Sequence, residues 1–228
     1  MKNHIVILGG MGPQASLRLH EMLINNNVDK DKQPDEFPTI LHLSLAIPDF
    51  IESQEATDEA VSIINDASTS VPLDLACAVG VACNTAHLLL DRLVELPKHN
   101  FVSMIDAVTQ EISSRGLTRV GLLASPVTIK SRLYHDALSI RGIEVIQPSK
   151  SDISILNTVI RDVISGVSPG LLRAKLTKIA DKLQSSGADC ILLGCTELPL
   201  VGIDINLPVI DSLSCLAQEM LKKHQSTV

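Results

Sequence analysis

Two cysteines stand at matching places in the sequence, each at the end of a short apolar run. Cys83 follows the run AVGVA and precedes Asn84 and Thr85, while Cys195 follows ILLG and precedes Thr196. Free backbone amides at the start of a helix or turn attract anions and lower the pKa of a thiol. A single cysteine in such a place can simply fill the end of a strand. The matched pair instead indicates two thiols that exchange protons with a ligand.

A pair of thiols suits the inversion of a carbon centre. One thiolate removes a proton from one face of the carbon, and the other thiol returns a proton from the opposite face. Two near-equivalent thiols can exchange these roles, as a reversible racemisation requires. Backbone and side-chain donors around a substrate carboxylate would stabilise the carbanion. This chemistry needs neither a metal nor a cofactor, and the sequence predicts none.

The remaining cysteines indicate core positions. Five cysteines, an odd number without any CxxC pair, do not predict a disulfide framework, and the seven histidines have no zinc-like spacing near them. Cys77, Cys190 and Cys215 lie inside apolar patterns. Because cysteine is among the most buried residue types, we expect these three in the core.

Composition excludes several classes of partner. The 228 residues carry a net charge of −7 without a basic run, and only one tyrosine and three phenylalanines, which argues against nucleic-acid binding. The longest near-apolar run, around residues 75–83, is shorter than the roughly 20 residues of a membrane helix. We therefore expect a cytoplasmic protein with neither a nucleic-acid nor a membrane partner.

Short apolar runs alternate with longer amphipathic segments along the chain. The runs that predict strands are 4–10, 39–46, 77–83, 119–125, 143–148 and 190–195. Helices are predicted at 14–27, 55–69, 85–96 and 127–140, twice between 151 and 186, and from Ser212. In the first helix we expect Leu17, Leu23 and Ile24 to face inward. This alternation predicts an α/β fold with parallel sheets and helices on both faces.

The pattern restarts at mid-chain. Residues 7–23 aligned on 122–138 pair Ser16 with Ser131 and His20 with His135 at an offset of 115, and the two cysteines are 112 apart. Chance similarity is the alternative, but we expect two similar halves, 1–118 and 119–228, with helix 212–224 as a candidate to pack back on the first half. In such sheets ligands bind at the carboxyl ends of strands, where both cysteines stand.

The glycine-rich stretch GGMGP at 9–13 follows the first predicted strand. It lacks the third glycine of a dinucleotide fingerprint and the lysine of a P-loop, so it is a weak nucleotide motif. It fits better as a loop that brings backbone amides to a small ligand.

Three motifs, ILGGMGP (7–13), ACNTAH (82–87) and LLGCTE (192–197), together resemble those of the aspartate/glutamate racemase family, whose members work without pyridoxal phosphate. Their spacing matches along essentially the whole chain, and they are closest to the aspartate-racemase branch. The resemblance implies two pseudo-symmetric Rossmann-like domains with the active site between them, a free amino acid as substrate, and a homodimer.

The resemblance also assigns residues. It implies that Cys83 and Cys195 are the acid and base of an isomerase. The residues implied in substrate binding are Met11, Gly12, Asn84, Thr85, Thr196 and Glu197. His87 falls in a motif as well. For His87 and Glu197, hydrogen bonding at a helix start or capping is the alternative to a role in the reaction.

Two positions depart from the family pattern. Aspartate racemases carry an arginine after Pro-Asp where AIPDFIES (46–53) has Phe50, and a second loop, here SGVSPG (165–170), commonly offers a lysine where Ser168 stands. The departure leaves the reaction type in place and the substrate open. The alternatives are a cofactor-free decarboxylase or cis–trans isomerase of the same fold, and a non-catalytic small-ligand or redox-sensing protein.

Overall fold

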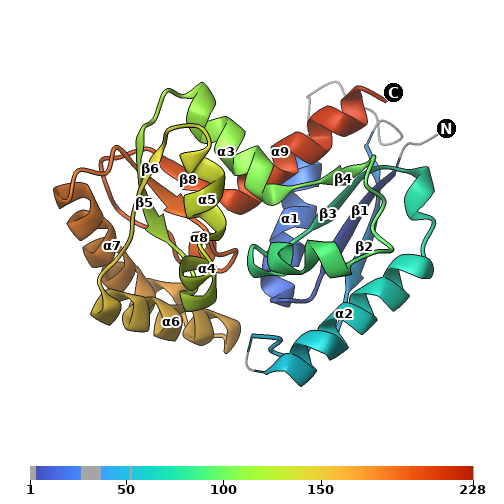
Figure 1. Ribbon diagram of the computed structural model, residues 1–228, viewed down its shortest axis with the longest axis horizontal. Helices are drawn as coiled ribbons and strands as arrows, with labels where there is room; N and C mark the ends of the chain where they lie inside the picture. The colour runs from blue at the N-terminus through green and yellow to red at the C-terminus, as the bar shows by residue number, and fades with distance from the viewer. Residues whose placement is uncertain (1–3, 27–36, 52, 228) are drawn as a thin grey trace. The chain divides into compact units, whose positions relative to one another are not determined.

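A computed structural model of the chain describes residues 4–26, 37–51 and 53–227. The chain forms two compact units. The first comprises Met1–Met104 and Leu216–Val228, and the second comprises Ile105–Cys215 (Figure 1). None of the described helices is long and apolar enough to cross a membrane.

The first unit is built on a parallel sheet with the order β2-β1-β3-β4. Its strands are β1 (His4–Gly9), β2 (Thr39–Ser44), β3 (Ala76–Val81) and β4 (Phe101–Val102). Its helical elements are α1 (Pro13–Asn25), α2 (Gln54–Thr69), η2 (Leu73–Leu75), η3 (Thr85–Arg92) and most of α9 (Ser212–Gln225).

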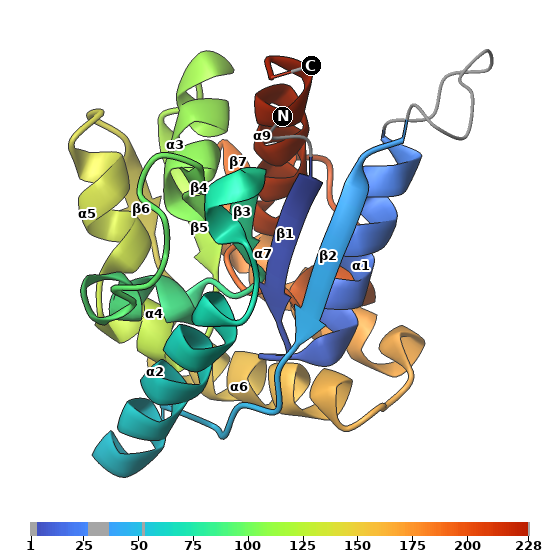
Figure 2. The ribbon, with the colours of Figure 1, turned by 90° about the vertical axis from the view of Figure 1, so that its right-hand side faces the viewer.

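Helices cover both faces of this sheet. Alternate residues of β1, Val6 and Leu8, share an apolar cluster with Ile64 of α2. Helix α1 packs beside β1 and β2 (Figure 2). On β3, a side chain at Gly80 would lie 2.6 Å from the sulfur of Met220, so the glycine admits α9 against the strand. The period-two pattern of the strands therefore supplies two buried faces.

The second unit has a parallel sheet with the order β6-β5-β7-β8. Its strands are β5 (Arg119–Leu123), β6 (Glu144–Ile146), β7 (Cys190–Leu193) and β8 (Val209–Asp211). Its helices are α3 (Met104–Ser114), α4 (Pro126–Lys130), α5 (Leu133–Ser139), α6 (Lys150–Ile164), α7 (Pro169–Ser185) and α8 (Leu198–Val201).

This sheet also buries both faces. Leu123 and Leu193 lie in one cluster with α6 and α7, and Leu122 and Leu192 lie in another with α3 and α5 (Figure 1). The two sheets share one topology, since β5 lies between β6 and β7 as β1 lies between β2 and β3. The predicted α/β class, with two parallel sheets flanked by helices, is confirmed.

The predicted inward face of the first helix is partly wrong. Leu23 is buried, but Leu17 is 65% and Ile24 38% exposed. The buried residues of α1 include Ala15, Leu19 and Leu23, spaced four apart on one side of the helix. A helix turns about 100° per residue, so Leu17 and Ile24 lie outside this stripe.

Two predicted helices take another form. The segment predicted at 85–96 is a 3-10 helix over Thr85–Arg92. The helix predicted at 127–140 is divided into α4 and α5 at Arg132, whose φ of 59° is left-handed. Elements α3, α8, β4 and β8 were not predicted. The two strands are too short to show a period-two pattern.

Candidate active site

Cys83 lies two residues beyond the end of β3 and is 7% exposed. The Ala82 N–H donates to Leu8 O at 2.9 Å, which extends the pairing with β1 as far as the residue before the cysteine. Asn84 and Thr85 follow, with Asn84 only 2% exposed. The turn after β3 therefore places a buried thiol and a buried amide at the carboxyl end of the sheet.

His87 binds the backbone at two places, one in this turn and one at the start of α3. Its Nδ1 lies 2.9 Å from Cys83 O, and its Nε2 accepts the Met104 N–H at 3.1 Å. Since Nε2 accepts an amide proton, we assign the neutral ring with its proton on Nδ1, donated to Cys83 O. This arrangement supports a positioning role for His87.

Cys195 stands in the same relation to β7. It lies two residues beyond the strand, is 8% exposed, and follows Gly194, whose N–H donates to Leu123 O at 2.8 Å. A side chain at Gly194 would lie 3.0 Å from both Leu122 and Tyr134. The fully buried Tyr134 therefore depends on a glycine at this turn.

Glu197 contacts the second thiol directly. Cys195 Sγ donates to Glu197 Oε2 at 3.0 Å, and Thr196 Oγ1 donates to the same oxygen at 3.2 Å. Glu197 is 4% exposed, and its other oxygen, Oε1, is buried without a hydrogen-bond partner among the described atoms. The side chain does not cap α8, so the capping alternative does not hold for Glu197.

The contact between Cys195 and Glu197 was not predicted. The sequence placed Glu197 in a motif, but its bond to a cysteine two residues earlier depends on the turn after β7. Helix and strand periodicity does not predict such a bond. Side chains two residues apart are not neighbours on a helix surface, and they are not partners across a sheet.

The other cysteines are core residues, as predicted. Burial raises the pKa of Cys190 and of Cys215 to about 12, and burial also raises the pKa of Cys77. A thiol that resists ionisation in this way is a poor nucleophile and a poor base near neutral pH.

The loop after β1 runs close to the strand end of β2. Gly10 has a φ of +100°, and a side chain there would collide with the carbonyl of Leu45. The Leu45 N–H donates to Gly9 O at 3.0 Å, which fixes this approach. Met11 then packs against the apolar cluster that contains Cys83, next to the buried Gly12.

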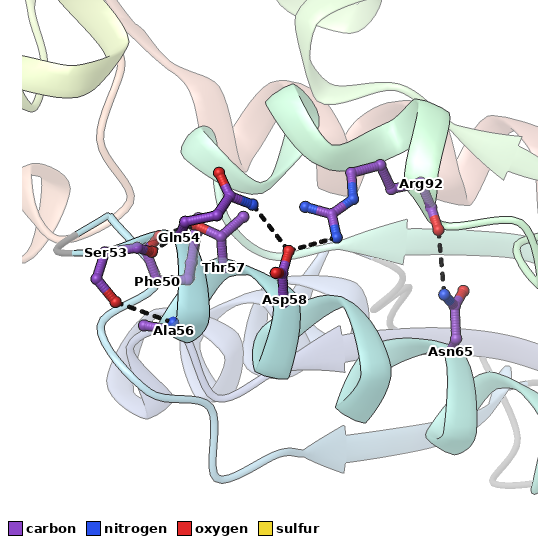
Figure 3. A network of polar contacts seen from close by, with 8 residues as sticks. All are labelled: Phe50, Ser53, Gln54, Ala56, Thr57, Asp58, Asn65 and Arg92. Atoms are coloured by element: carbon purple, nitrogen blue, oxygen red, sulfur yellow. Dashed lines mark hydrogen bonds and ion pairs between the residues drawn. The ribbon is translucent and has the colours of Figure 1, made fainter.

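Phe50 belongs to the same cluster as Cys83 and is 8% exposed. Its loop is tied to the start of α2, where Phe50 O accepts from Thr57 Oγ1 at 2.6 Å and Ser53 Oγ accepts from the Ala56 N–H at 3.1 Å (Figure 3). The first unit thus brings Met11, Phe50 and Cys83 into one apolar cluster.

Helix α2 is in turn tied to η3, the segment that follows Cys83. Asp58 accepts from Gln54 at 2.8 Å and from Arg92 at 2.7 Å, and Asn65 donates to Arg92 O at 3.1 Å (Figure 3). The bond from Arg92 lowers the pKa of Asp58. Through these contacts α2 connects the loop of Phe50 with the element after the first thiol.

Ser168 lies in the second unit, directly before α7. Its side chain is exposed and makes no capping hydrogen bond. The neighbouring Val167 packs on the apolar cluster that contains Cys195. In the part of the chain that the structure describes, no group of three or more His, Cys, Asp or Glu side chains is arranged to hold a metal.

Comparison with known proteins shows which family and which solved structures this chain is similar to. The model of the family described as Asp/Glu/Hydantoin racemase matches residues 8–220. A Picrophilus torridus aspartate racemase is 28% identical over 99% of this chain and 95% of that chain, with a TM-score of 0.84. An aspartate racemase homologue from Pyrococcus horikoshii OT3 is 26% identical over 99% of this chain and 100% of the other, with a TM-score of 0.80.

Among curated sequences, a glutamate racemase of Roseiflexus sp. is 35% identical over 128 residues, which is 54% of this chain and 45% of that protein. A Pectobacterium carotovorum protein described as uncharacterised is 38% identical over 100 residues, which is 44% of this chain and 66% of that protein. The matches therefore span less than two thirds of these two relatives.

Proposed function

The chain belongs to the Asp/Glu/Hydantoin racemase family, and from this we propose that it is an isomerase that racemises a free amino acid without a cofactor, with Cys83 and Cys195 as acid and base. One observation carries the proposal: each thiol lies two residues beyond the third strand of a sheet of the same topology. Equivalent thiols can exchange the roles of acid and base.

The proposed reaction has two proton transfers. A thiolate takes the α-proton, so that the C–H bond breaks, an S–H bond forms and the electron pair remains on the α-carbon, delocalised into the carboxylate. The second thiol then gives its proton to the opposite face, which forms the new C–H bond and leaves a thiolate. The reverse reaction uses the same groups with their roles exchanged.

We assign substrate binding to hydrogen-bond donors near the two thiols. The buried side chains of Asn84 and Thr196, together with Thr85, can bind the carboxylate and amino groups. Backbone around Met11 and Gly12 completes this set. In line with the family resemblance, we propose a homodimer in the cytoplasm. Light scattering coupled to gel filtration tests the oligomeric state.

The apolar environment of Phe50 bears on the substrate. A second carboxylate buried without a cation costs several kcal/mol, and an arginine fork is the usual remedy. Phe50 is buried in the cluster of Cys83, and Ser168 is uncharged. We therefore expect aspartate and glutamate to have kcat/KM values no higher than those of neutral amino acids of similar size.

A substrate screen tests this expectation. A wild-type enzyme that strongly prefers aspartate over asparagine and homoserine would contradict it. Phe50→Arg combined with Ser168→Lys is expected to raise kcat/KM for aspartate. Because Phe50 is buried, the Phe50→Arg change also lowers stability, so the variant must be assayed well below its melting temperature.

The central experiment incubates the purified protein with each L-amino acid in D₂O. We expect the D-enantiomer to form, with deuterium at the α-carbon and no release of CO₂. Release of CO₂ would identify a decarboxylase. Ligand-induced thermal stabilisation without any turnover would identify a binding protein, and either result would reject the racemase proposal.

A further inference from the structure

We propose that strand β2 is the surface through which this chain forms a homodimer. In this dimer β2 pairs antiparallel with β2 of a second copy, and His42 lies opposite His42 of that copy at the two-fold axis. The proposal rests on the homodimer proposed above and names the surface that forms it. It uses residues of the first unit alone and needs no bound ligand.

Strand β2 differs from the other edge strands of the two described sheets. Strands β4, β6 and β8 have two or three residues each, and short edges resist pairing with other chains. Strand β2 has six residues, and among the residues that the structure describes it pairs only with β1 (Figure 2). Its sequence TILHLS has no proline, lysine, arginine, aspartate or glutamate, the residue types that usually protect an edge. The described part of the chain therefore leaves this long edge available to a further strand.

One hydrogen bond shows which backbone groups lie on this edge. The Leu45 N–H donates to Gly9 O at 3.0 Å, so Leu45 directs its backbone groups toward β1. Because the direction alternates along a strand, the backbone groups of Ile40, His42 and Ser44 point away from β1. Each of these three residues offers one N–H donor and one C=O acceptor to a second strand.

A second copy of β2 matches this edge in one antiparallel register. In an antiparallel ladder, residues whose backbone groups face each other exchange two hydrogen bonds. With His42 opposite His42 of the second copy, Ile40 pairs with Ser44 in both directions, and all three outward residues are used. A shift of two residues one way pairs Ser44 with Pro38, which has no N–H. A shift the other way places Ile40 opposite Ala46, which lies beyond the end of β2.

The exposed apolar residues of α1 lie on the same side of the first unit. The rings of His20 and His42 have centroids 5.6 Å apart, which places His20 on the side of α1 that faces β2. A helix turns by about 100° per residue, so Ile24 lies about 40° and Leu17 about 60° around the helix from His20. Leu17 is 65% and Ile24 38% exposed. A second copy paired along β2 gives these two side chains an apolar surface to contact.

Charge does not oppose the pairing of two identical strands. Burial is the main cause that lowers the pKa of His42, and His20 adds to this shift, so the neutral ring is favoured at neutral pH. Two neutral rings can lie opposite each other at the axis, whereas like charges placed directly opposite destabilise a sheet. A two-fold interface also requires a surface that is complementary to itself, and β2 meets this requirement because Ile40 and Ser44 exchange places across the axis.

The dissociation constant of the dimer tests the surface. Leu17→Glu places a carboxylate in the proposed contact, and we expect it to raise the dissociation constant by at least about tenfold, because burying a charge is costly. The matched control is Leu171→Glu on α7, a leucine that is 72% exposed in the second unit, and we expect no change there. Sedimentation velocity over a range of concentrations measures both. Equal effects of the two changes, no effect of Leu17→Glu, or a wild type that stays monomeric would each overturn the proposal.

Disulfide formation tests the register. In the proposed ladder the two His42 Cα atoms are about 5.5 Å apart, within the range of a disulfide, whereas the two Thr39 Cα atoms are about 20 Å apart. Since the native cysteines are buried, mild oxidation is expected to give a covalent dimer of His42→Cys and none of Thr39→Cys. A covalent dimer of Thr39→Cys, or none of either variant, overturns the register.

Hydrogen exchange in the wild type identifies the occupant of the edge. We expect the amides of Ile40, His42 and Ser44 to exchange more slowly as the concentration, and with it the dimer fraction, rises. Slow exchange in the monomer would identify a segment of the chain itself as the occupant, and fast exchange in the dimer would place the interface elsewhere. Either result overturns the proposal.

None of these measurements depends on turnover. A racemase assay that fails rejects the proposed activity alone. A dimer that Leu17→Glu leaves intact rejects this surface alone, and a monomeric wild type rejects the homodimer together with its surface.

Discussion

The ends of β3 and β7 share one backbone arrangement and differ in chemistry. In each, the residue before the cysteine donates to the neighbouring strand, at 2.9 Å for Ala82 and 2.8 Å for Gly194. Beyond that point His87 binds the backbone of Cys83, whereas Glu197 binds the thiol of Cys195. A repeated fold thus supplies the position of each thiol, and the residues that follow differ in what they bind, which is the backbone in the first unit and the thiol in the second.

A second difference lies beneath the two turns. Tyr134 is fully buried against Gly194. In the first unit, Leu19 corresponds to Tyr134 at the repeat offset of 115 residues, and Ala82 corresponds to Gly194 at the offset of 112. A tyrosine needs more room than a leucine, and the missing side chain at residue 194 provides it. The two turns therefore tolerate different substitutions although their strands are equivalent.

The largest expected effect concerns the thiols themselves. We expect Cys83→Ser and Cys195→Ser each to lower racemisation by about 10²–10⁴-fold or more, because each removes one acid–base group. Each variant can still exchange the α-proton of one enantiomer with solvent, and we expect the two variants to act on opposite enantiomers. Chiral chromatography and deuterium incorporation measure the two processes. Near wild-type racemisation by either variant would contradict the two-thiol mechanism.

The next prediction concerns the contacts of His87 with the backbone of the first unit. His87→Ala leaves the Met104 N–H and Cys83 O without their partner, and an unsatisfied buried group costs about 1–3 kcal/mol. We expect a melting temperature several degrees lower and a reduced kcat, measured by calorimetry and by the racemase assay. A variant with unchanged stability would show that the ring does not hold the turn.

The matched prediction in the second unit concerns Gly194. Gly194→Ala places a methyl group about 3 Å from Tyr134 and Leu122, and overpacking of this kind costs about 1–3 kcal/mol. Adding Tyr134→Leu is expected to recover part of this loss, because it recreates the pair of the first unit. Denaturant unfolding measures the free energies. A double variant that is less stable than the sum of the two single changes would contradict this explanation.

The fold was largely predictable from the sequence. Strands of four or more apolar residues, such as β1 and β7, were predicted correctly, and the family predicted from the three motifs is confirmed. The edge strands β4 and β8 have two and three residues, so their pairing arises from the sheet and not from a local pattern.

The sequence indicated candidate residues for the site but not the contacts that these residues make. It named Cys83, Cys195 and Glu197, whose roles stay predictions, and it placed Cys190 in the core, where this residue is fully buried. The bond from Cys195 to Glu197 and the two bonds of His87 depend on turn geometry and on Met104, seventeen residues away along the chain. Local patterns carry no information on such contacts.

The smallest effect compares two histidines, His42 of β2 and His135 of α5. Burial is the main cause that lowers the pKa of each below the ordinary 6.5. Each histidine therefore binds its proton at a higher pH in the unfolded chain than in the folded chain. Their contribution to the free energy of unfolding is fully present above about pH 6.5 and is lost as the pH drops toward the folded pKa values. Thermal melting against pH should show this loss in the wild type and a smaller one in His42→Gln and in His135→Gln.

His20 adds to the shift at His42, whereas at His135 the effect of Arg132 is opposed by Asp136. A wild type whose melting temperature is constant from pH 7 to mildly acidic pH would contradict both assignments.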